Sequence, residues 1–252
     1  MDMTHDFGAA TARADAAPPA RWLSYAEAPR TAFALVRLMW AAPRLALAPR
    51  GDGSKVLVIP GFATGDGATA ILRTYLMWLG YRSYGWGLGR NVGAKTVGVH
   101  NERLLERLDV VSDGGRDAVH VIGWSMGGIM ARLMAHEVPE RIRQVITLGS
   151  PFAGNPYSNI AWQSYERISG HKLSDPAARA QIALSKLAPP VPSTSIYSRS
   201  DGVVAWESCL EPDHPHTENI EVGGAHCGLG FCPSVLLTIA ERLASPLPPA
   251  AT

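Results

Sequence analysis

VHVIGWSMGGIM, residues 119–130, joins an apolar run to a glycine-rich turn and then to a second apolar stretch. The first part has the continuous apolar character of a strand that is buried on both faces. After Gly128 the apolar residues recur with helical spacing. The segment therefore predicts a buried strand that turns abruptly into a helix, with Ser125 at the turn.

The glycines around Ser125 give this turn a chemical meaning. Gly123 and Gly127 complete the pattern Gly-x-Ser-x-Gly, which between a strand and a helix forms a nucleophile elbow. The serine takes a strained backbone conformation that lifts its hydroxyl clear of the sheet, and only small neighbours fit beside it. We expect Ser125 to be a nucleophile and the backbone N–H of Met126 to stabilise an oxyanion. A glycine-rich turn with a capping serine is the alternative.

Composition limits the classes of protein to consider. The chain has 252 residues, of which 46% are hydrophobic and 18% charged, and its net charge is +1. These values fit one large α/β domain and give no overall reason to expect nucleic acid or an anionic membrane as a partner. Arg37, Pro43 and Arg44 interrupt the apolar segment 31–47, so we expect an amphipathic helix there and no stable membrane span.

The ends of the chain and the cysteines bear on location. Residues 1–20 lack the apolar core of a secretory signal, and we expect a disordered tail there. Three cysteines and no export signal favour a reducing compartment, so the predicted location is the cytoplasm. A disulfide between Cys209 and Cys227 remains open.

Periodicity divides the remaining chain into an N-terminal helical arm (21–49), an α/β domain (50–244) and a tail (245–252). Strands and helices alternate in the domain, which predicts a mostly parallel sheet flanked by helices. The expected strands are 55–59, 81–86, 118–122, 144–149, 193–198 and 219–222. The expected helices are 69–79, 97–111, 129–137, 177–187 and 233–243.

Two segments depart from this alternation. Residues 154–192 are longer than a usual connection, so we expect a small helical cap insertion whose aromatic residues suit an apolar substrate, with ordinary packing as the alternative. Residues 85–93 are rich in glycine but lack the dinucleotide-binding spacing, and a loop over a pocket is the better interpretation.

A serine nucleophile needs a base and a group that orients the base. Asp201 directly follows a predicted strand, whereas Asp175 resembles a helix N-cap and Asp213 lies in a polar loop. His226 follows the last predicted strand in a loop of small residues. We therefore expect Asp201 to orient His226, and His226 to activate Ser125.

The loop after the first predicted strand contains Pro60-Gly61-Phe62. Its position predicts the backbone N–H of Phe62 as a second oxyanion donor, with Ala63 or a purely structural turn as alternatives. Gly61 permits close approach of a substrate carbonyl. Trp124, Phe152 and Gly61 are the candidate residues of the substrate pocket.

Taken together, several segments resemble the α/β-hydrolase superfamily, closest to its bacterial lipase-like and esterase-like members. The segments are Val56–Phe62, Gly123–Gly128, Gly149–Pro151, Ser200–Val204 and Gly223–His226. The resemblance covers about residues 50–244. It implies a Ser125, Asp201 and His226 triad that acts through an acyl-enzyme, with no metal or organic cofactor. The chain departs from the His-Gly oxyanion loop common in that group, because it has Pro60-Gly61.

The leading hypothesis is therefore hydrolysis of a small carboxylic ester with an apolar acyl group. Acyl transfer to another alcohol would use the same triad, and a non-catalytic binding protein could share the fold. A metal site formed by the C-terminal cysteines and histidines is a further alternative, although their spacing matches no common zinc pattern.

Overall fold

The computed structural model describes residues 16–247. Residues 1–15 of the expected N-terminal tail and 248–252 of the expected C-terminal tail lie outside this range, and residues 16–20 form no regular element. Within the described range, no helix is both long and apolar enough to cross a bilayer.

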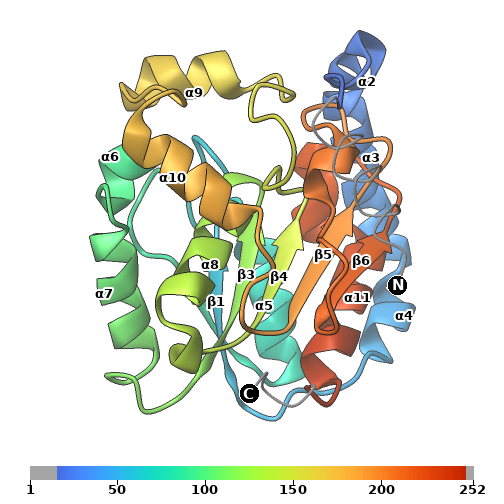
Figure 1. The fold of residues 1–252 in the computed structure, drawn as a ribbon. Helices are drawn as coiled ribbons and strands as arrows, with labels where there is room; N and C mark the ends of the chain where they lie inside the picture. The colour runs from blue at the N-terminus through green and yellow to red at the C-terminus, as the bar shows by residue number, and fades with distance from the viewer. Residues whose placement is uncertain (1–15, 248–252) are drawn as a thin grey trace, which may run out of the picture.

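A six-stranded parallel sheet in the order β2-β1-β3-β4-β5-β6 forms the centre of the molecule (Figure 1). The strands are β1 (Lys55–Ile59), β2 (Arg82–Gly85), β3 (Val119–Trp124), β4 (Ile142–Leu148), β5 (Ser193–Tyr197) and β6 (Thr217–Glu221). The chain moves from β1 to one edge and then returns to the other side of β1 to form β3. The carboxyl ends of β1 and β3 therefore flank the crevice where open α/β sheets bind ligands.

Helices cover both faces of the sheet. The core of one face contains α5 and α11, and that of the other contains α7 and α8. In chain order, the helices of the described residues are α2 (Arg21–Tyr25), α3 (Glu27–Trp40), α4 (Ala42–Ala46), α5 (Ala70–Leu79), α6 (Ala94–Val97), α7 (Glu102–Val111), α8 (Met126–Glu137), α9 (Trp162–Ser169), α10 (Pro176–Ser185) and α11 (Pro233–Ala244). Short 3-10 helices are η1 (Pro139–Arg141), η2 (Trp206–Cys209) and η3 (His226–Phe231). The predicted mostly parallel sheet flanked by helices is confirmed.

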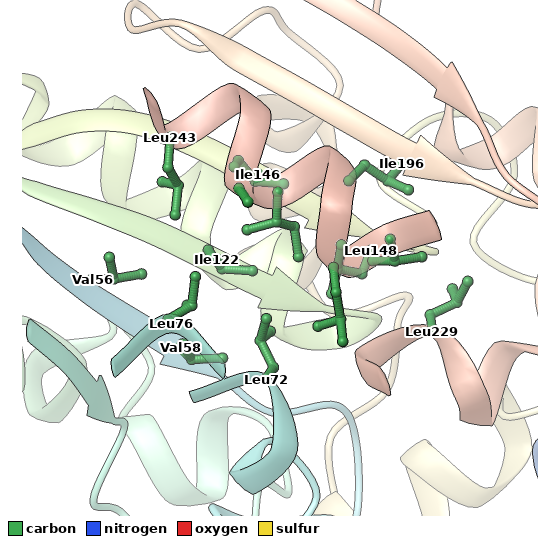
Figure 2. Packing of buried hydrophobic residues seen from close by; sticks show 14 of the residues in the cluster. Val56, Val58, Leu72, Leu76, Ile122, Ile146, Leu148, Ile196, Leu229 and Leu243 are labelled. Carbon is green, nitrogen blue, oxygen red and sulfur yellow. The ribbon is translucent and has the colours of Figure 1, made fainter. Parts of the chain in front are cut away.

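Strand alternation divides the core into two layers, because successive side chains point to opposite faces. Val56 and Val58 of β1 pack toward α5 and α11 in the layer that Figure 2 shows. Leu57 and Ile59 pack toward α7 and α8 on the other face. The burial on both faces that the continuous apolar runs predict is confirmed, because every residue of β1 and β3 is buried.

Some element boundaries differ from the prediction. The expected helix 97–111 begins only at Glu102, because Gly98 and Asn101 have positive φ values of 88° and 58° and separate it from the short α6. The cap contains α9 in addition to the predicted helix, which is α10. Figure 1 shows α9 above the carboxyl ends of the strands and α10 descending from the cap toward α8, which it contacts.

Candidate active site

Ser125 occupies the turn between β3 and α8 with φ 53° and ψ −121°, a conformation that residues with a Cβ rarely adopt. Its neighbours have to be glycines. A Cβ on Gly123 would clash with the carbonyl of Gly127, and a Cβ on Gly127 would clash with the carbonyl of Ile59. The turn is anchored because the N–H of Ser125 donates a 2.8 Å hydrogen bond to the carbonyl of Leu148. The local geometry is that of a nucleophile elbow.

The loop after β1 lies beside the elbow. A Cβ placed on Gly61 would lie 3.3 Å from the Cβ of Ser125, so this glycine leaves room next to the serine. Met126 is the first residue of α8, and a helix leaves the N–H groups of its first turn without intrahelical partners. The backbone of the Phe62 loop and the N-terminus of α8 therefore meet at Ser125.

Asn91 holds this loop in place, a role that the sequence did not predict. Its side-chain nitrogen donates a 2.8 Å hydrogen bond to the carbonyl of Pro60, and its backbone carbonyl accepts one of 2.7 Å from Ala63. Asn91 is fully buried. The glycine-rich segment 85–93 thus fixes the loop after β1 through the hydrogen bonds of Asn91. The single asparagine among the glycines was the sequence signal that could have indicated this role.

Asp201 and His226 are in direct contact at the carboxyl ends of β5 and β6. Nδ1 of His226 lies 2.6 Å from Oδ2 of Asp201, and both side chains are buried. The other oxygen of Asp201 accepts 2.8 Å hydrogen bonds from the N–H groups of Val203 and Val204, which fix the carboxylate. With Nδ1 engaged in this way, Nε2 of His226 is left as the basic nitrogen.

One hydrogen bond connects this pair to the elbow, and a glycine leaves room for the pair. The indole nitrogen of Trp124 donates a 3.2 Å hydrogen bond to the backbone carbonyl of His226. Gly149, with φ 54°, follows β4, and a Cβ there would lie 3.1 Å from Nδ1 of His226 and 3.2 Å from Oδ2 of Asp201. A larger residue at position 149 would crowd the pair.

The electrostatic surroundings favour the protonated form of His226. Burial lowers the pKa of the imidazole, but the charges of Asp201 and Glu27 and the hydrogen bond to Asp201 act in the opposite direction. The net result is a pKa above the usual value of histidine.

The two alternative acids of the sequence analysis lie elsewhere: Asp175 precedes α10 in the cap, and Asp213 is exposed.

A cavity opens at Ser125 and extends under the cap. Including its opening to solvent, it contains about 1120 Å³ of empty space. Its floor is the face of α8 that carries Met126, Ile129, Met130 and Leu133. Across the cavity, α9 contributes Trp162 and Tyr165, and α10 contributes Ile182. Among residues 16–247, no charged side chain lines it.

The candidate pocket residues lie in different places. Phe152 lines the cavity, and the guanidinium of Arg132 stacks on its ring at 3.7 Å from the centroid. Phe62 also lines the cavity and contacts Tyr165 edge to face, with ring centroids 5.8 Å apart. Gly61 lies against Ser125, but Trp124 faces away from the cavity and packs against Gly230 of η3.

The structure also locates the cysteines and the candidate metal ligands. All three cysteines, Cys209, Cys227 and Cys232, are free. Cys209 and Cys227 therefore form no disulfide in this structure. Over the described part of the chain, no three histidine, cysteine, aspartate or glutamate side chains gather in a metal-binding arrangement.

Comparison with known proteins identifies the fold. A sequence profile described as "alpha/beta hydrolase fold" matches residues 99–165, which include the elbow. No curated protein matches the chain in sequence.

Solved structures share the architecture at low sequence identity. Lipase B of Aspergillus fumigatus is 19% identical with a TM-score of 0.59, and the match covers 81% of this chain and 56% of that one. The monoacylglycerol lipase of Paleococcus ferrophilus is 13% identical with a TM-score of 0.55, covering 77% and 97%. An alpha/beta superfamily hydrolase of Oenococcus oeni is 16% identical with a TM-score of 0.54, covering 77% and 94%. This chain therefore spans little more than half the length of the fungal lipase, and it has the α/β-hydrolase fold.

Proposed function

We propose that this protein of α/β-hydrolase fold cleaves carboxylic esters through an acyl-enzyme on Ser125. The observation that carries the proposal is the position of Ser125. It lies at positive φ at the head of an apolar cavity, and the Asp201–His226 pair is connected to its elbow. Strained backbone at a cavity is typical of functional sites. The lipases among the solved structures of the same fold are consistent with this activity.

In the first half of the proposed reaction, Oγ of Ser125 attacks the ester carbonyl while Nε2 of His226 accepts the hydroxyl proton. Asp201 holds the imidazole through Nδ1 and stabilises the imidazolium that forms. The N–H groups of Met126 and Phe62 receive the negative charge on the carbonyl oxygen. When the tetrahedral intermediate collapses, the C–O bond to the alcohol breaks, and His226 returns the proton to the leaving alkoxide.

In the second half, water attacks the acyl group on Ser125, and His226 accepts a proton from the water. Collapse of the second intermediate breaks the bond to Oγ and releases the carboxylic acid. The proton on His226 returns to Ser125. The cycle consumes one ester and one water molecule and needs no cofactor.

The cavity supports an uncharged substrate with an apolar acyl group. Its floor repeats apolar side chains at helical spacing along α8, and its polar contributions are amide and hydroxyl groups such as Asn101 and Ser185. Each methylene of an acyl chain transferred from water to such a surface is worth about 0.8 kcal/mol, or about fourfold in kcat/KM. Activity should therefore increase with acyl length until the cavity is full.

The test is a series of p-nitrophenyl esters of increasing acyl length. We expect hydrolysis by the wild-type protein, with kcat/KM rising along the series, and loss of this activity in Ser125→Ala. Ser164→Ala is the matched control, because Ser164 is exposed on α9 and is absent from the cavity wall. Equal rates for Ser125→Ala and wild type, or no ester hydrolysis by wild type, would refute the proposed function.

A further inference from the structure

The inner side of α3 reaches the two loops that carry Asp201 and His226. Glu27, the first residue of this helix, is only 7% exposed. Its Oε1 accepts hydrogen bonds from the backbone N–H of Gly202 at 2.8 Å and of His226 at 3.0 Å. Its Oε2 accepts a 3.0 Å hydrogen bond from the N–H of Cys227. One buried carboxylate therefore connects the N-terminal arm to both loops.

These hydrogen bonds act directly on the backbone of the candidate triad. Gly202 follows Asp201 in the chain, and His226 is itself a donor. Hydrogen bonds from N–H groups to a carboxylate are about twice as strong as those between neutral groups. Gly202 is also required for the approach of the arm, because a Cβ there would clash with the carbonyl of Leu23. The relative position of the two loops thus depends on a residue that is 175 positions from Gly202 and 199 positions from His226 in sequence.

We propose that Glu27 is a positioning residue that sets the geometry of the Asp201–His226 pair for catalysis. This inference rests on the proposed function. No residue of the arm lines the cavity, among residues 16–247, so Glu27 acts through His226 and Asp201 and has no contact with the acyl group.

The charged and titratable groups around His226 allow a specific test. Asp201 faces it from the loop after β5, Glu27 faces it from α3, and the thiol of Cys227 follows it in η3. Arg30, one turn further along α3, is engaged with the backbone carbonyl and hydroxyl of Ser200 at 2.7 and 2.6 Å. Removal of the negative charge of Glu27 should therefore make protonation of His226 less favourable.

The variant Glu27→Gln keeps the size of the side chain but removes its charge and replaces one acceptor oxygen by an NH₂ donor. We expect kcat/KM to fall about 10- to 100-fold, because a displacement of the imidazole on the order of 1 Å has an effect of this size. The loss should be in kcat, with KM little changed. The acid limb of the pH profile should move to lower pH. Ser24→Ala is the matched control: it removes the 2.6 Å hydrogen bond from the arm to the carbonyl of Gly202 without changing charge, and it should leave the acid limb in place.

The titration of His226 followed by NMR gives a readout that needs no turnover, and thermal unfolding establishes that the variant is folded. An unchanged His226 titration and unchanged kcat in folded Glu27→Gln would overturn the inference while the Ser125-dependent activity stands. Retained ester hydrolysis in Ser125→Ala would instead reject the proposed function. If Glu27→Gln does not fold, Glu27→Asp, which keeps the charge on a shorter side chain, should lower kcat without moving the acid limb, and unchanged kcat would overturn the inference.

The outer side of the same arm carries a second, independent feature. Six large apolar side chains on it are more than 60% exposed: Trp22, Tyr25, Phe33, Met39, Trp40 and Leu47. We name this surface the arm face. Figure 1 shows α2, α3 and α4 along one side of the molecule, away from α7 and from the cap helices α9 and α10. Large exposed apolar surfaces of this kind mark interaction sites.

The exposed charges of the arm and its flanking residues 16–50 have one sign. Residues 16–50 contain five arginines and one acidic residue, Glu27, which is buried. Arg21, Arg37, Arg44 and Arg50 are exposed. The net charge of +1 for the whole chain hides this local excess. A second copy of the chain packed symmetrically on the arm face would bring the arginines of the two arms together, and neither arm has an exposed acidic residue to pair with them, which is unfavourable.

Tryptophan, tyrosine and arginine beside aliphatic side chains are the composition that binds the interface of a bilayer. We infer that the arm face binds an anionic lipid surface, with the aromatic and aliphatic side chains inserted between headgroups and the arginines contacting lipid phosphates. This inference does not depend on the catalytic chemistry. It gives the exposed side of α3 a partner, while its buried side holds the two loops.

Vesicle flotation with the full chain tests this assignment. We expect binding to vesicles of phosphatidylcholine with phosphatidylglycerol to be about tenfold or more tighter than to phosphatidylcholine alone, and to weaken with salt. Trp40→Gln and Arg37→Gln should each weaken it. Val110→Gln is the matched control, because Val110 is 66% exposed on α7, and it should bind like wild type.

No binding of wild type to anionic vesicles would overturn the lipid assignment, as would equal binding by Trp40→Gln. A dimer in light scattering that Trp40→Gln converts to a monomer would assign the arm face to a second copy instead. Equal loss of binding in Val110→Gln would show that the effect is not specific to the arm face.

Discussion

The indole nitrogen of Trp124 donates a 3.2 Å hydrogen bond to the backbone carbonyl of His226, and this bond joins the residue before the elbow serine to the histidine loop. The ring also packs closely against Gly230, where a Cβ would lie 2.7 Å from it. Through Trp124, strand β3 and the helix η3 are held together behind the site. The contact fixes the backbone from which the imidazole extends.

Trp124→Phe removes this hydrogen bond between β3 and η3. We expect the free energy of unfolding to fall by about 0.5–1.5 kcal/mol and kcat to fall while KM changes little. Urea unfolding and steady-state kinetics measure the two effects. Trp206→Phe, in η2 and stacked on Tyr197, is the matched control and should leave kcat close to wild type.

The pH dependence of hydrolysis follows from the raised pKa of His226. In the proposed reaction the neutral imidazole is the base, so kcat/KM should increase with pH as His226 loses its proton, with a midpoint above the usual histidine pKa of 6.5. The contribution of this pair to stability changes with pH in the opposite direction. Because the folded-state pKa is raised, the contribution of the Asp201–His226 pair is fully present below the unfolded-state pKa and is lost as pH rises through the folded-state pKa.

Asp201→Asn tests the origin of this shift. Burial, which lowers the pKa of His226, remains, while the main charge that raises it is gone. The acid limb should therefore move to lower pH, and kcat should fall about 10⁴-fold because the imidazole loses its orienting carboxylate. A pH profile of kcat/KM that superimposes on wild type would show that Asp201 does not act on the base.

Ile182→Trp tests the position of the acyl group. Ile182 extends from α10 into the cavity, and an indole there would fill space that long acyl chains need. We expect unchanged hydrolysis of the shortest ester and a loss of about 1–3 kcal/mol in transition-state binding for long ones. The same ester series measures it. Leu184→Trp, on the exposed side of the same helix, should keep the wild-type preference.

A buried ion pair supports the wall behind the cavity. Arg132 of α8 and Glu211 contact each other without solvent exposure, and Arg132 also donates to the carbonyls of Ser185 and Leu187 at 2.7 and 2.6 Å. Arg132→Met leaves the carboxylate buried without this guanidinium and should lower the free energy of unfolding by about 3–5 kcal/mol. Chemical denaturation checks the value. A loss below about 1 kcal/mol would mean that the pair contributes little.

Much of the fold could be predicted because its signals are local. Strands β1, β3 and β4 are buried on both faces and therefore appear as continuous apolar runs, and Gly80 marks the end of α5 with its left-handed conformation. The break before α7 could not be predicted in this way, because the apolar spacing of residues 97–101 continues through a glycine with positive φ.

The candidate site was predictable in part for the same reason. Ser125, Asp201 and His226 each follow a strand, so their places along the chain indicated a shared edge of the sheet. The position of Trp124 beside the serine predicts a pocket residue, but strand alternation puts its side chain on the face of Ile122, toward α11. The contacts of Glu27 and Asn91 join segments that are distant in sequence, so no local sequence pattern predicts them.

Labelling with a fluorophosphonate, followed by intact mass and peptide mapping, tests the central proposal most directly. Such a probe reacts with a serine only where a base activates it and an oxyanion site stabilises the adduct. We predict one adduct per chain, located on Ser125, and its loss in both Ser125→Ala and His226→Ala. An unlabelled wild-type protein, or an adduct on another residue, would contradict the account.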